Sequence, residues 1–167
     1  MQIRAAMVDD AAAVVAFFQQ LYAESHFMLF EPGEAVPTIS EQAQRIQRGI
    51  ETTSGTMLLC EADKQLIGVC YGTRGIAKRS CHSLYVVLGV LQVWSGQGVG
   101  RLLMQQLEAW ARAQQLHRME LMVQVDNQRA LGLYEKLGFQ REGLSAHSLY
   151  IAGRYVDEFS MAKLLED

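Results

Sequence analysis

The sequence has few cysteines, and their spacing excludes two common kinds of site. Three occur among the 167 residues, Cys60, Cys70 and Cys81, and none of them has a Cys-x-x-Cys or Cys/His spacing. An odd number of cysteines without such a spacing argues against a disulfide framework and against a zinc site. We therefore expect reduced thiols, no bound metal and a cytoplasmic location.

Long apolar runs and an excess of positive charge are also missing. No stretch reaches the roughly 18 apolar residues of a membrane-spanning helix, and Arg4 and Asp9-Asp10 interrupt the N-terminal segment where a signal peptide would be apolar. The net charge of -3 and a pI near 5.8 indicate no basic surface for nucleic acid. These features predict a protein that binds neither membranes nor nucleic acid.

Helical and extended patterns alternate along the chain without a linker, a repeat or a low-complexity segment, which predicts a single α/β domain over residues 1–167. Apolar spacing and turn residues predict these elements in order: an extended start at 2–5, a helix at 9–24, a helix from 40 to about 50, a hairpin at 57–74 turning at 62–65, a strand at 84–93, a helix at 99–111, a strand at 119–125, a short helix after 127, and strands at 139–142 and 154–162.

Several boundaries carry specific expectations. Asp9-Asp10 and Ser40 are the candidate caps of the first two helices, and Gly138 is the candidate left-handed residue that ends the short helix. The run 84–93 is apolar at both odd and even positions, so we expect a strand that is buried on both faces.

The most distinctive stretch is Trp94–Arg101, WSGQGVGR, which places three glycines between a strand pattern and a helix pattern. Backbone N–H groups in such a turn can face an anion with the positive end of the helix dipole behind them. A P-loop would need Gly-Lys-Ser/Thr after the loop, and a dinucleotide-binding turn would need G-x-G-x-x-G near the start of a βαβ unit. Neither pattern is present, so the loop predicts a phosphate site of another kind, with a plain tight turn as the alternative.

A second segment completes a family pattern. The tract VLQVWSGQGVGRLLMQQLEAWA resembles the first signature of the Gcn5-related N-acetyltransferases, V-x-P-x-x-[QR]-x-x-G-x-[GA], and DNQRALGLYEKLGF resembles the second, N-x-x-A-x-x-x-Y-x-x-x-G-F. The second is matched at every fixed position: Asn127, Ala130, Tyr134, Gly138 and Phe139. Both signatures occur in the family's order and spacing.

The resemblance implies a fold and a cofactor. The fold would be a mixed, mostly antiparallel, splayed sheet of about six to seven strands flanked by about four helices. The cosubstrate would be acetyl-CoA, held without a metal by these residues: Leu88, Gly89 and Val90 on the splayed strand, Gly96, Gln97, Gly98, Val99, Gly100 and Arg101 at its pyrophosphate, Asn127, and Tyr134 beside the sulfur. Taken singly, Asn127 is also a plain helix cap and Tyr134 a core aromatic residue.

The implied reaction is direct attack of a neutral amine on the thioester, without a covalent enzyme intermediate. A backbone N–H near Val90 would stabilise the oxyanion, and Tyr134 would act as general acid toward the thiolate. The places where many family members carry an acidic base hold Tyr85 and Met122. Glu120, two residues before Met122 and on the same strand face, is the acidic candidate.

Other bases and two further departures stay open. His26, His82 or a chain of water molecules could remove the proton instead. Ser95 stands where the family usually has Gln or Arg, and Gln92 stands where it usually has Pro, so one side-chain contact to the pyrophosphate is in doubt.

The predicted activity is transfer of an acetyl group from acetyl-CoA to a primary amine, which could belong to a small molecule, an amino acid or a protein N-terminus. The segment 24–53 and the C-terminal strands would select the acceptor, and the aromatic stretch HFMLFEPGE is a candidate pocket wall or homodimer contact. Because no base is evident, a catalytically silent acyl-CoA sensor is the alternative, and a nucleotide-binding regulatory domain is a third.

Overall fold

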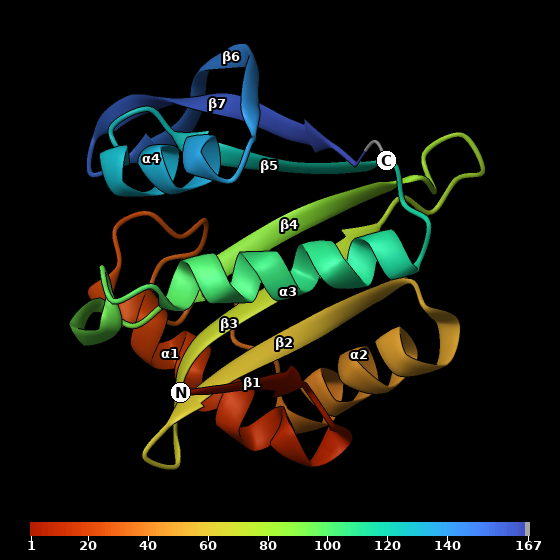
Figure 1. The fold of residues 1–167 in the computed structure, drawn as a ribbon. Coiled ribbons are helices and arrows are strands. Elements are labelled where there is room, and N and C mark those ends of the chain that lie inside the picture. The colour runs from red at the N-terminus through yellow and green to blue at the C-terminus, as the bar shows by residue number, and fades with distance from the viewer. Residues whose placement is uncertain (166–167) are drawn as a thin grey trace.

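A seven-stranded sheet organises residues 1–165, the part of the chain that the computed structural model describes (Figure 1). The strand order across the sheet is β1-β2-β3-β4-β5-β7-β6, and every neighbouring pair is antiparallel except β4 and β5, which are parallel. The strands are β1 Gln2–Ala5, β2 Gly55–Ala62, β3 Gln65–Arg74, β4 Ser83–Val90, β5 Arg118–Gln124, β6 Gln140–Ile151 and β7 Arg154–Leu164. The expected mixed, mostly antiparallel sheet is confirmed.

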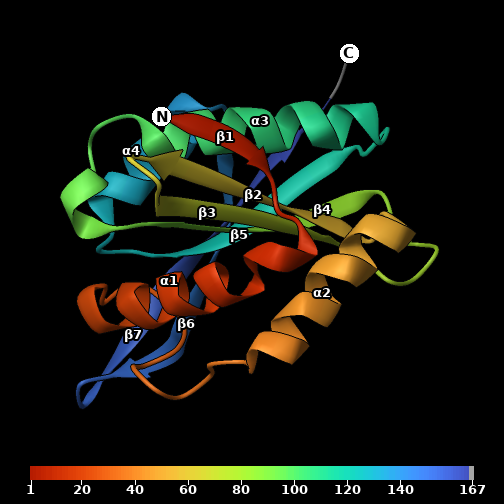
Figure 2. The same cartoon turned by 90° about the horizontal axis from the view of Figure 1, so that it is seen from below.

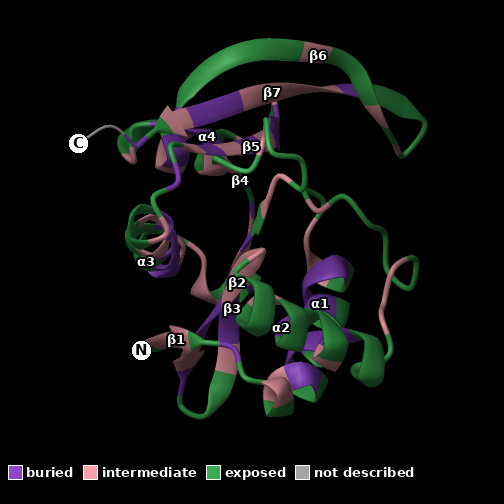
Figure 3. Ribbon diagram, turned by 90° about the vertical axis from the view of Figure 1, so that its right-hand side faces the viewer, coloured by how far each residue is buried: buried purple, intermediate pink, exposed green. Residues whose placement is uncertain are grey.

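Helices cover both faces of this sheet. They are α1 Ala11–Glu24, α2 Ile39–Thr52, α3 Val99–Ala113 and α4 Gln128–Lys136, with short 3-10 turns at Val8–Asp10 and Gln92–Trp94. Figures 2 and 3 show α1 and α2 together on one face and α3 on the other. Within the described residues, no helix combines the length and the apolar character needed to span a membrane.

The start of α2 differs from the sequence expectation. Its N-cap is Thr38, not Ser40, because Thr38 and Glu41 form a reciprocal capping box. The Glu41 backbone N–H donates to the Thr38 hydroxyl at 3.2 Å, and the Thr38 backbone N–H donates to the Glu41 carboxylate at 2.7 Å. Two N–H groups without helical partners are satisfied in this way, which places the cap two residues earlier than expected.

The expected carboxylate cap of α1 is also wrong in its detail. Asp10 occupies the N-cap position, but its carboxylate makes no capping hydrogen bond to α1. It accepts instead from the Met7 backbone N–H at 2.7 Å and from the Arg4 guanidinium at 2.7 and 2.8 Å. Asp10 therefore joins β1 to the turn before α1, and the competing cation explains why it does not cap the helix.

Two tight turns form hairpins where the sequence predicts them. Asp63 and Lys64 between β2 and β3 both have positive φ, and so do Ala152 and Gly153 between β6 and β7. Two consecutive residues of positive φ match the twist of antiparallel strands. The strand expected at 139–142 continues to Ile151, because pairing with β7 resumes after irregularities in the register at Arg141–Gly143 and Ser145–Leu149.

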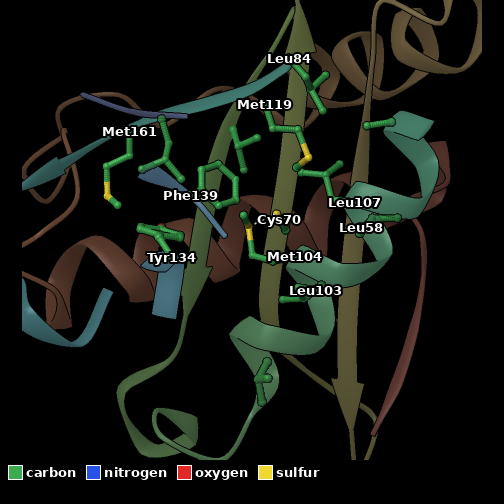
Figure 4. Packing of buried hydrophobic residues seen from close by; sticks show 14 of the residues in the cluster. Leu58, Cys70, Leu84, Leu103, Met104, Leu107, Met119, Tyr134, Phe139 and Met161 are labelled. Carbon is green, nitrogen blue, oxygen red and sulfur yellow. Dashed lines mark hydrogen bonds between the residues drawn. The ribbon is translucent and has the colours of Figure 1, made fainter. Parts of the chain in front are cut away.

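The core consists of two clusters, one on each face of the sheet. The larger joins the α3 face to α4 and includes Leu103, Leu107, Cys70 and Tyr134 (Figure 4). The smaller lies between α1, α2 and the opposite face and includes Phe17, Leu21 and Leu91. Strand β4 contributes Leu84 and Val86 to the larger cluster, and Leu91, the residue after the strand, belongs to the smaller one.

Candidate active site

Strands β4 and β5 separate in the middle of the sheet. They pair over only three positions, Ser83–Tyr85 with Arg118–Glu120, although both strands continue for several residues beyond. The expectation of a β4 buried on both faces therefore fails in part: Tyr85 is 43% exposed, and Val87, Leu88 and Val90 are half-buried. Beyond Tyr85 the neighbouring strand is lost, which leaves Val87, Leu88 and Val90 less covered.

The hydrogen-bond pattern shows which backbone groups face the opening. The Leu91 N–H donates to Ile67 and the Gly75 N–H donates to Ser83, each to the residue opposite in the β3–β4 register. In an antiparallel pair such hydrogen-bonded positions alternate, so the odd residues of β4 bond to β3. The N–H and C=O groups of Leu88 and Val90 consequently point away from β3, toward the side from which β5 has departed.

Gly89 has a different environment from its two neighbours. By the same alternation its N–H and C=O groups face β3, and a Cβ at this position would lie 2.4 Å from Leu21 Cδ2 of α1. The glycine is needed for close packing of α1 against β4. Of the three β4 residues predicted to contact a cofactor, Leu88 and Val90 present backbone groups to the opening, and Gly89 does not.

The glycine loop leads directly into α3. Gly98 is the N-cap of the helix with φ 87°, and Gly96 has φ 78°, both in the left-handed region that side chains disfavour. The first bond of α3 runs from the Leu102 N–H to the Gly98 carbonyl at 3.0 Å. The N–H groups of Val99, Gly100 and Arg101 precede that bond, and none donates to a described residue. This turn therefore offers donors at the positive end of a helix, which suits an anion.

The remaining loop residues build the walls around these donors. Gln97 holds the loop through a bond from its side-chain amide to the Val93 carbonyl at 2.8 Å. A Cβ on Gly100 would lie 3.2 Å from both Leu133 and Leu88, so this glycine allows α3, α4 and β4 to approach one another. Ser95 is half-buried, and its hydroxyl makes no hydrogen bond with a described residue.

A groove of about 460 Å³ lies between α3 and α4 beside this turn. Its charged lining residues are Arg101, Glu108, Lys136 and Lys163, and of these Glu108 accepts from Lys163 at 2.6 Å. Arg101 and Lys136 form no ion pair with a described residue, so they leave the groove positive. Sequence reasoning named Arg101 and missed Lys136, although Lys136 lies two residues after Tyr134 in the second signature.

Asn127 caps α4 as the simpler interpretation predicted. Its side-chain oxygen accepts from the Ala130 N–H at 3.2 Å. The other end of its amide, the NH₂ group, donates to no described residue. The cap interpretation and a binding role are therefore compatible, because each uses a different end of the side chain.

Tyr134 is buried on α4, where its ring lies 5.8 Å from that of Phe139, between centroids. Its hydroxyl makes no hydrogen bond with a described residue. Burial, together with the nearby Cys70 and Tyr85, raises the pKa of the Tyr134 hydroxyl well above its usual range. Tyr134 is thus a neutral hydrogen-bond donor at every physiological pH, although a raised pKa makes full transfer of its proton less favourable than an ordinary phenol would allow.

The opposite face carries a second recess at the point where the strands part. A pocket of about 390 Å³ is lined there by the end of β3, the following loop, and the start of β4 and β5, including Arg74, Tyr85 and Glu120. Glu120 lies opposite Tyr85 in the register, and it shares the strand face of Met122, as its spacing predicts. The Arg118 Nε donates to the Glu120 carboxylate at 2.8 Å.

The two histidine candidates lie elsewhere. His26 is exposed in the segment after α1, and His82 is exposed before β4, with its ring 6.3 Å from that of His117. Neither lines the pocket beside Tyr85 and Glu120. Within residues 1–165 there is also no group of three or more His, Cys, Asp or Glu side chains arranged to hold a metal ion.

Comparisons with known proteins match this geometry. A sequence model described as "Acetyltransferase (GNAT) family" matches residues 15–139. A GNAT-family acetyltransferase structure from Streptococcus pneumoniae is 30% identical, with a TM-score of 0.95 and coverage of 98% of this chain and 99% of that one. The structure of yncA from Salmonella typhimurium with acetyl-CoA is similar in fold, with 18% identity, a TM-score of 0.89 and coverage of 100% and 95%.

Curated relatives are similar over shorter stretches. The L-amino acid N-acetyltransferase AaaT of Escherichia coli is 36% identical over 75 residues, 42% of this chain and 44% of AaaT. The N-alpha-acetyltransferase RimI of Mycobacterium tuberculosis is 36% identical over 76 residues, 46% of this chain and 45% of RimI. The chain thus spans about half the length of the curated relatives it matches. Taken with the family match over residues 15–139 and the full-length structural similarity, these relationships show that the chain belongs to the GNAT acetyltransferase family.

Proposed function

We propose that this protein transfers the acetyl group of acetyl-CoA to a primary amine of a small molecule, an amino acid or a protein N-terminus. One observation carries the proposal: the unpaired half of β4 lies beside the free N–H groups of the first turn of α3. The amide groups of a pantetheine arm can pair with a free strand edge. The pyrophosphate next to that arm is an anion, which suits the N–H groups at the start of a helix.

The residues present fit that cosubstrate. The backbone groups of Leu88 and Val90 would hold the pantetheine arm, and the N–H groups of Gly98 to Arg101 would hold the pyrophosphate. The Asn127 NH₂ group would donate to the same molecule, and the positive groove of Arg101 and Lys136 would accommodate further phosphate charge. Ser95 offers a hydroxyl where family members offer a longer side chain, so the backbone carries more of the recognition.

Acetyl-CoA, when bound, supplies an acyl group activated as a thioester. The N–H of Val90 would donate to the carbonyl oxygen as negative charge develops on it. Tyr134 would donate a hydrogen bond, and then its proton, to the departing sulfur. Its lack of a protein partner supports this role, because the hydroxyl is free to bind the sulfur without breaking another hydrogen bond.

The amine would enter from the pocket beside Tyr85 and Glu120. Glu120 remains the acidic candidate at this entrance, and its bond with Arg118 leaves one carboxylate oxygen without a partner among the described residues. A pocket of about 390 Å³ is the size of a small amine or of a chain terminus.

Two measurements, made one after the other, test the proposed function. Isothermal titration should detect acetyl-CoA binding, and a thiol-release assay should then detect turnover with at least one member of a panel of amines, amino acids and N-terminal peptides. Binding without turnover, together with no effect of Tyr134→Phe on binding, would favour the acyl-CoA sensor. Stabilisation by ATP or NAD with no binding of coenzyme A would favour the nucleotide-binding alternative and contradict the proposal.

A further inference from the structure

We propose that Glu24 is a positioning residue for the cosubstrate site: its carboxylate accepts the Gln92 N–H and so fixes the segment that joins β4 to the glycine loop. The proposal rests on the binding of acetyl-CoA proposed above. It also accounts for a departure in the sequence, because the first signature has proline at position 92, and proline has no N–H to donate.

The contact lies where α1 packs against β4. A Cβ on Gly89 would lie 2.4 Å from Leu21 Cδ2, so the helix approaches the strand closely at this point. Glu24 follows Leu21 by three residues and therefore lies on the same face of α1, one turn further along. Its carboxylate accepts from the Gln92 N–H at 2.5 Å. The contacts of α1 with Gly89 and Gln92 thus flank Val90 in the sequence, whose N–H is the proposed oxyanion donor.

The Glu24 bond links the loop to another element of the fold. Gln92 begins the 3-10 turn Gln92–Trp94, and the first N–H groups of such a turn have no carbonyl within it to bond. Among the described residues, the other hydrogen bonds of residues 92–98 stay within the stretch from residue 91 to residue 102. Glu24 is therefore the hydrogen-bond partner that ties this loop to α1.

The position of Glu24 is unfavourable for α1 itself. It is the last residue of the helix, where a negative charge meets the negative end of the helix dipole. Within residues 1–165 it forms no ion pair that would offset this repulsion. The stabilising contact of this carboxylate is therefore the one with Gln92.

Gln92 lies between the two parts of the proposed cosubstrate site. Two residues before it, Val90 presents its backbone groups to the opening between the strands. Six residues after it, Gly98 begins α3 and its free N–H groups. Trp94, between them, packs against both core clusters. Loss of the Glu24 bond would let the turn shift relative to Val90, so a ligand that contacts both parts would bind less tightly.

Proline at position 92 is a direct test, because the backbone there already suits it. Leu91 has φ -57° and ψ 143°, the extended conformation that a residue before proline adopts. A 3-10 turn has φ values in the range that a proline ring fixes. The Gln92 carbonyl would keep its bond from the Ser95 N–H. The substitution therefore removes the N–H that Glu24 binds and leaves the turn otherwise intact.

The test is a double-mutant cycle of Glu24→Ala and Gln92→Pro, with acetyl-CoA affinity measured by titration and both KM values by thiol release. We expect Glu24→Ala to raise the Kd and KM of acetyl-CoA by about five- to tenfold, with kcat and the amine KM within about twofold. In the Gln92→Pro background the same change should alter the Kd by less than about twofold, because no N–H is left unpaired. Glu24→Gln keeps an acceptor oxygen and should lose less affinity than Glu24→Ala.

Glu41→Ala is the matched control, because its carboxylate also accepts a backbone N–H, from Thr38 at 2.7 Å, but at the start of α2. It should lower stability and leave the Kd of acetyl-CoA unchanged. An unchanged Kd in Glu24→Ala, an equal rise in Glu41→Ala, or the same loss in the proline background would refute the positioning role. A rise in the amine KM alone would also refute it and assign Glu24 to the acceptor. Absence of acetyl-CoA binding by the wild type would refute the proposed function itself.

Discussion

Tyr85 and Glu120 lie opposite each other as the last paired residues of β4 and β5, and beyond them the two strands separate. Tyr85 therefore lies at the start of the opening between the two strands. Both residues also line the pocket of about 390 Å³ through which we propose that the amine enters.

Tyr134→Phe tests the proposed acid. Removing the hydroxyl should lower kcat by about a hundredfold or more, because the thiolate would leave without a proton. Stability should be unchanged or slightly higher, since no described residue loses a hydrogen bond. Steady-state kinetics and urea unfolding measure the two effects. An unchanged kcat would remove Tyr134 from the mechanism.

Gly98→Ala tests the helix start. No atom lies within 4 Å of the added Cβ, so the cost comes from the left-handed backbone alone and should be about 1–2 kcal/mol of unfolding free energy. Acetyl-CoA affinity should fall as well, because the first-turn N–H groups would be reoriented. Gly132→Ala is the control: this glycine also has open space but sits within α4 without a positive φ, and alanine there should stabilise by about 0.5–1 kcal/mol.

Gly89→Ala separates packing from cofactor contact. The new Cβ would lie 2.4 Å from Leu21 Cδ2, and forcing α1 to move should cost about 1–3 kcal/mol of stability. The backbone groups of Leu88 and Val90 would remain, so acetyl-CoA affinity measured by titration should stay within about threefold of wild type. A large loss of affinity with unchanged stability would restore Gly89 as a direct contact.

Asp10→Asn tests the ion pair at the N-terminus through pH. Hydrogen bonds from Arg4 lower the pKa of the Asp10 carboxyl below its unfolded value, so its contribution to stability is present above about pH 4 and is lost as the pH falls through the lower, folded value. The variant should be less stable than wild type at pH 7, and the difference in stability should narrow as the pH falls below about 4. Thermal unfolding across this range measures it. A constant difference would mean that Asp10 acts through its hydrogen bond to Met7 rather than through its charge.

Local sequence signals predicted much of the framework, and their failures have physical causes. The hairpin turn at 62–65, Asn127 as a cap and Gly138 as a left-handed terminus each depend on a few neighbouring residues, and each was confirmed. Ser40 is the expected cap of α2, but Thr38, two residues earlier, is equally suited to cap a helix and is the cap in the structure. The carboxylate of Asp10 went to Arg4, a partner six residues away that no capping pattern includes.

The sequence by itself indicated the family through its two signature segments. It also predicted the sheet, its helices and the glycine turn before α3, because these follow from apolar spacing and from glycines that act on their own backbone. Only the tertiary structure decided which backbone groups of β4 are free, since that depends on where β5 departs. It also showed that the backbone groups of Gly89 face β3 and that the absent side chain makes room for Leu21 of α1. Contacts between distant strands depend on register, and register is set by the packing of the whole sheet.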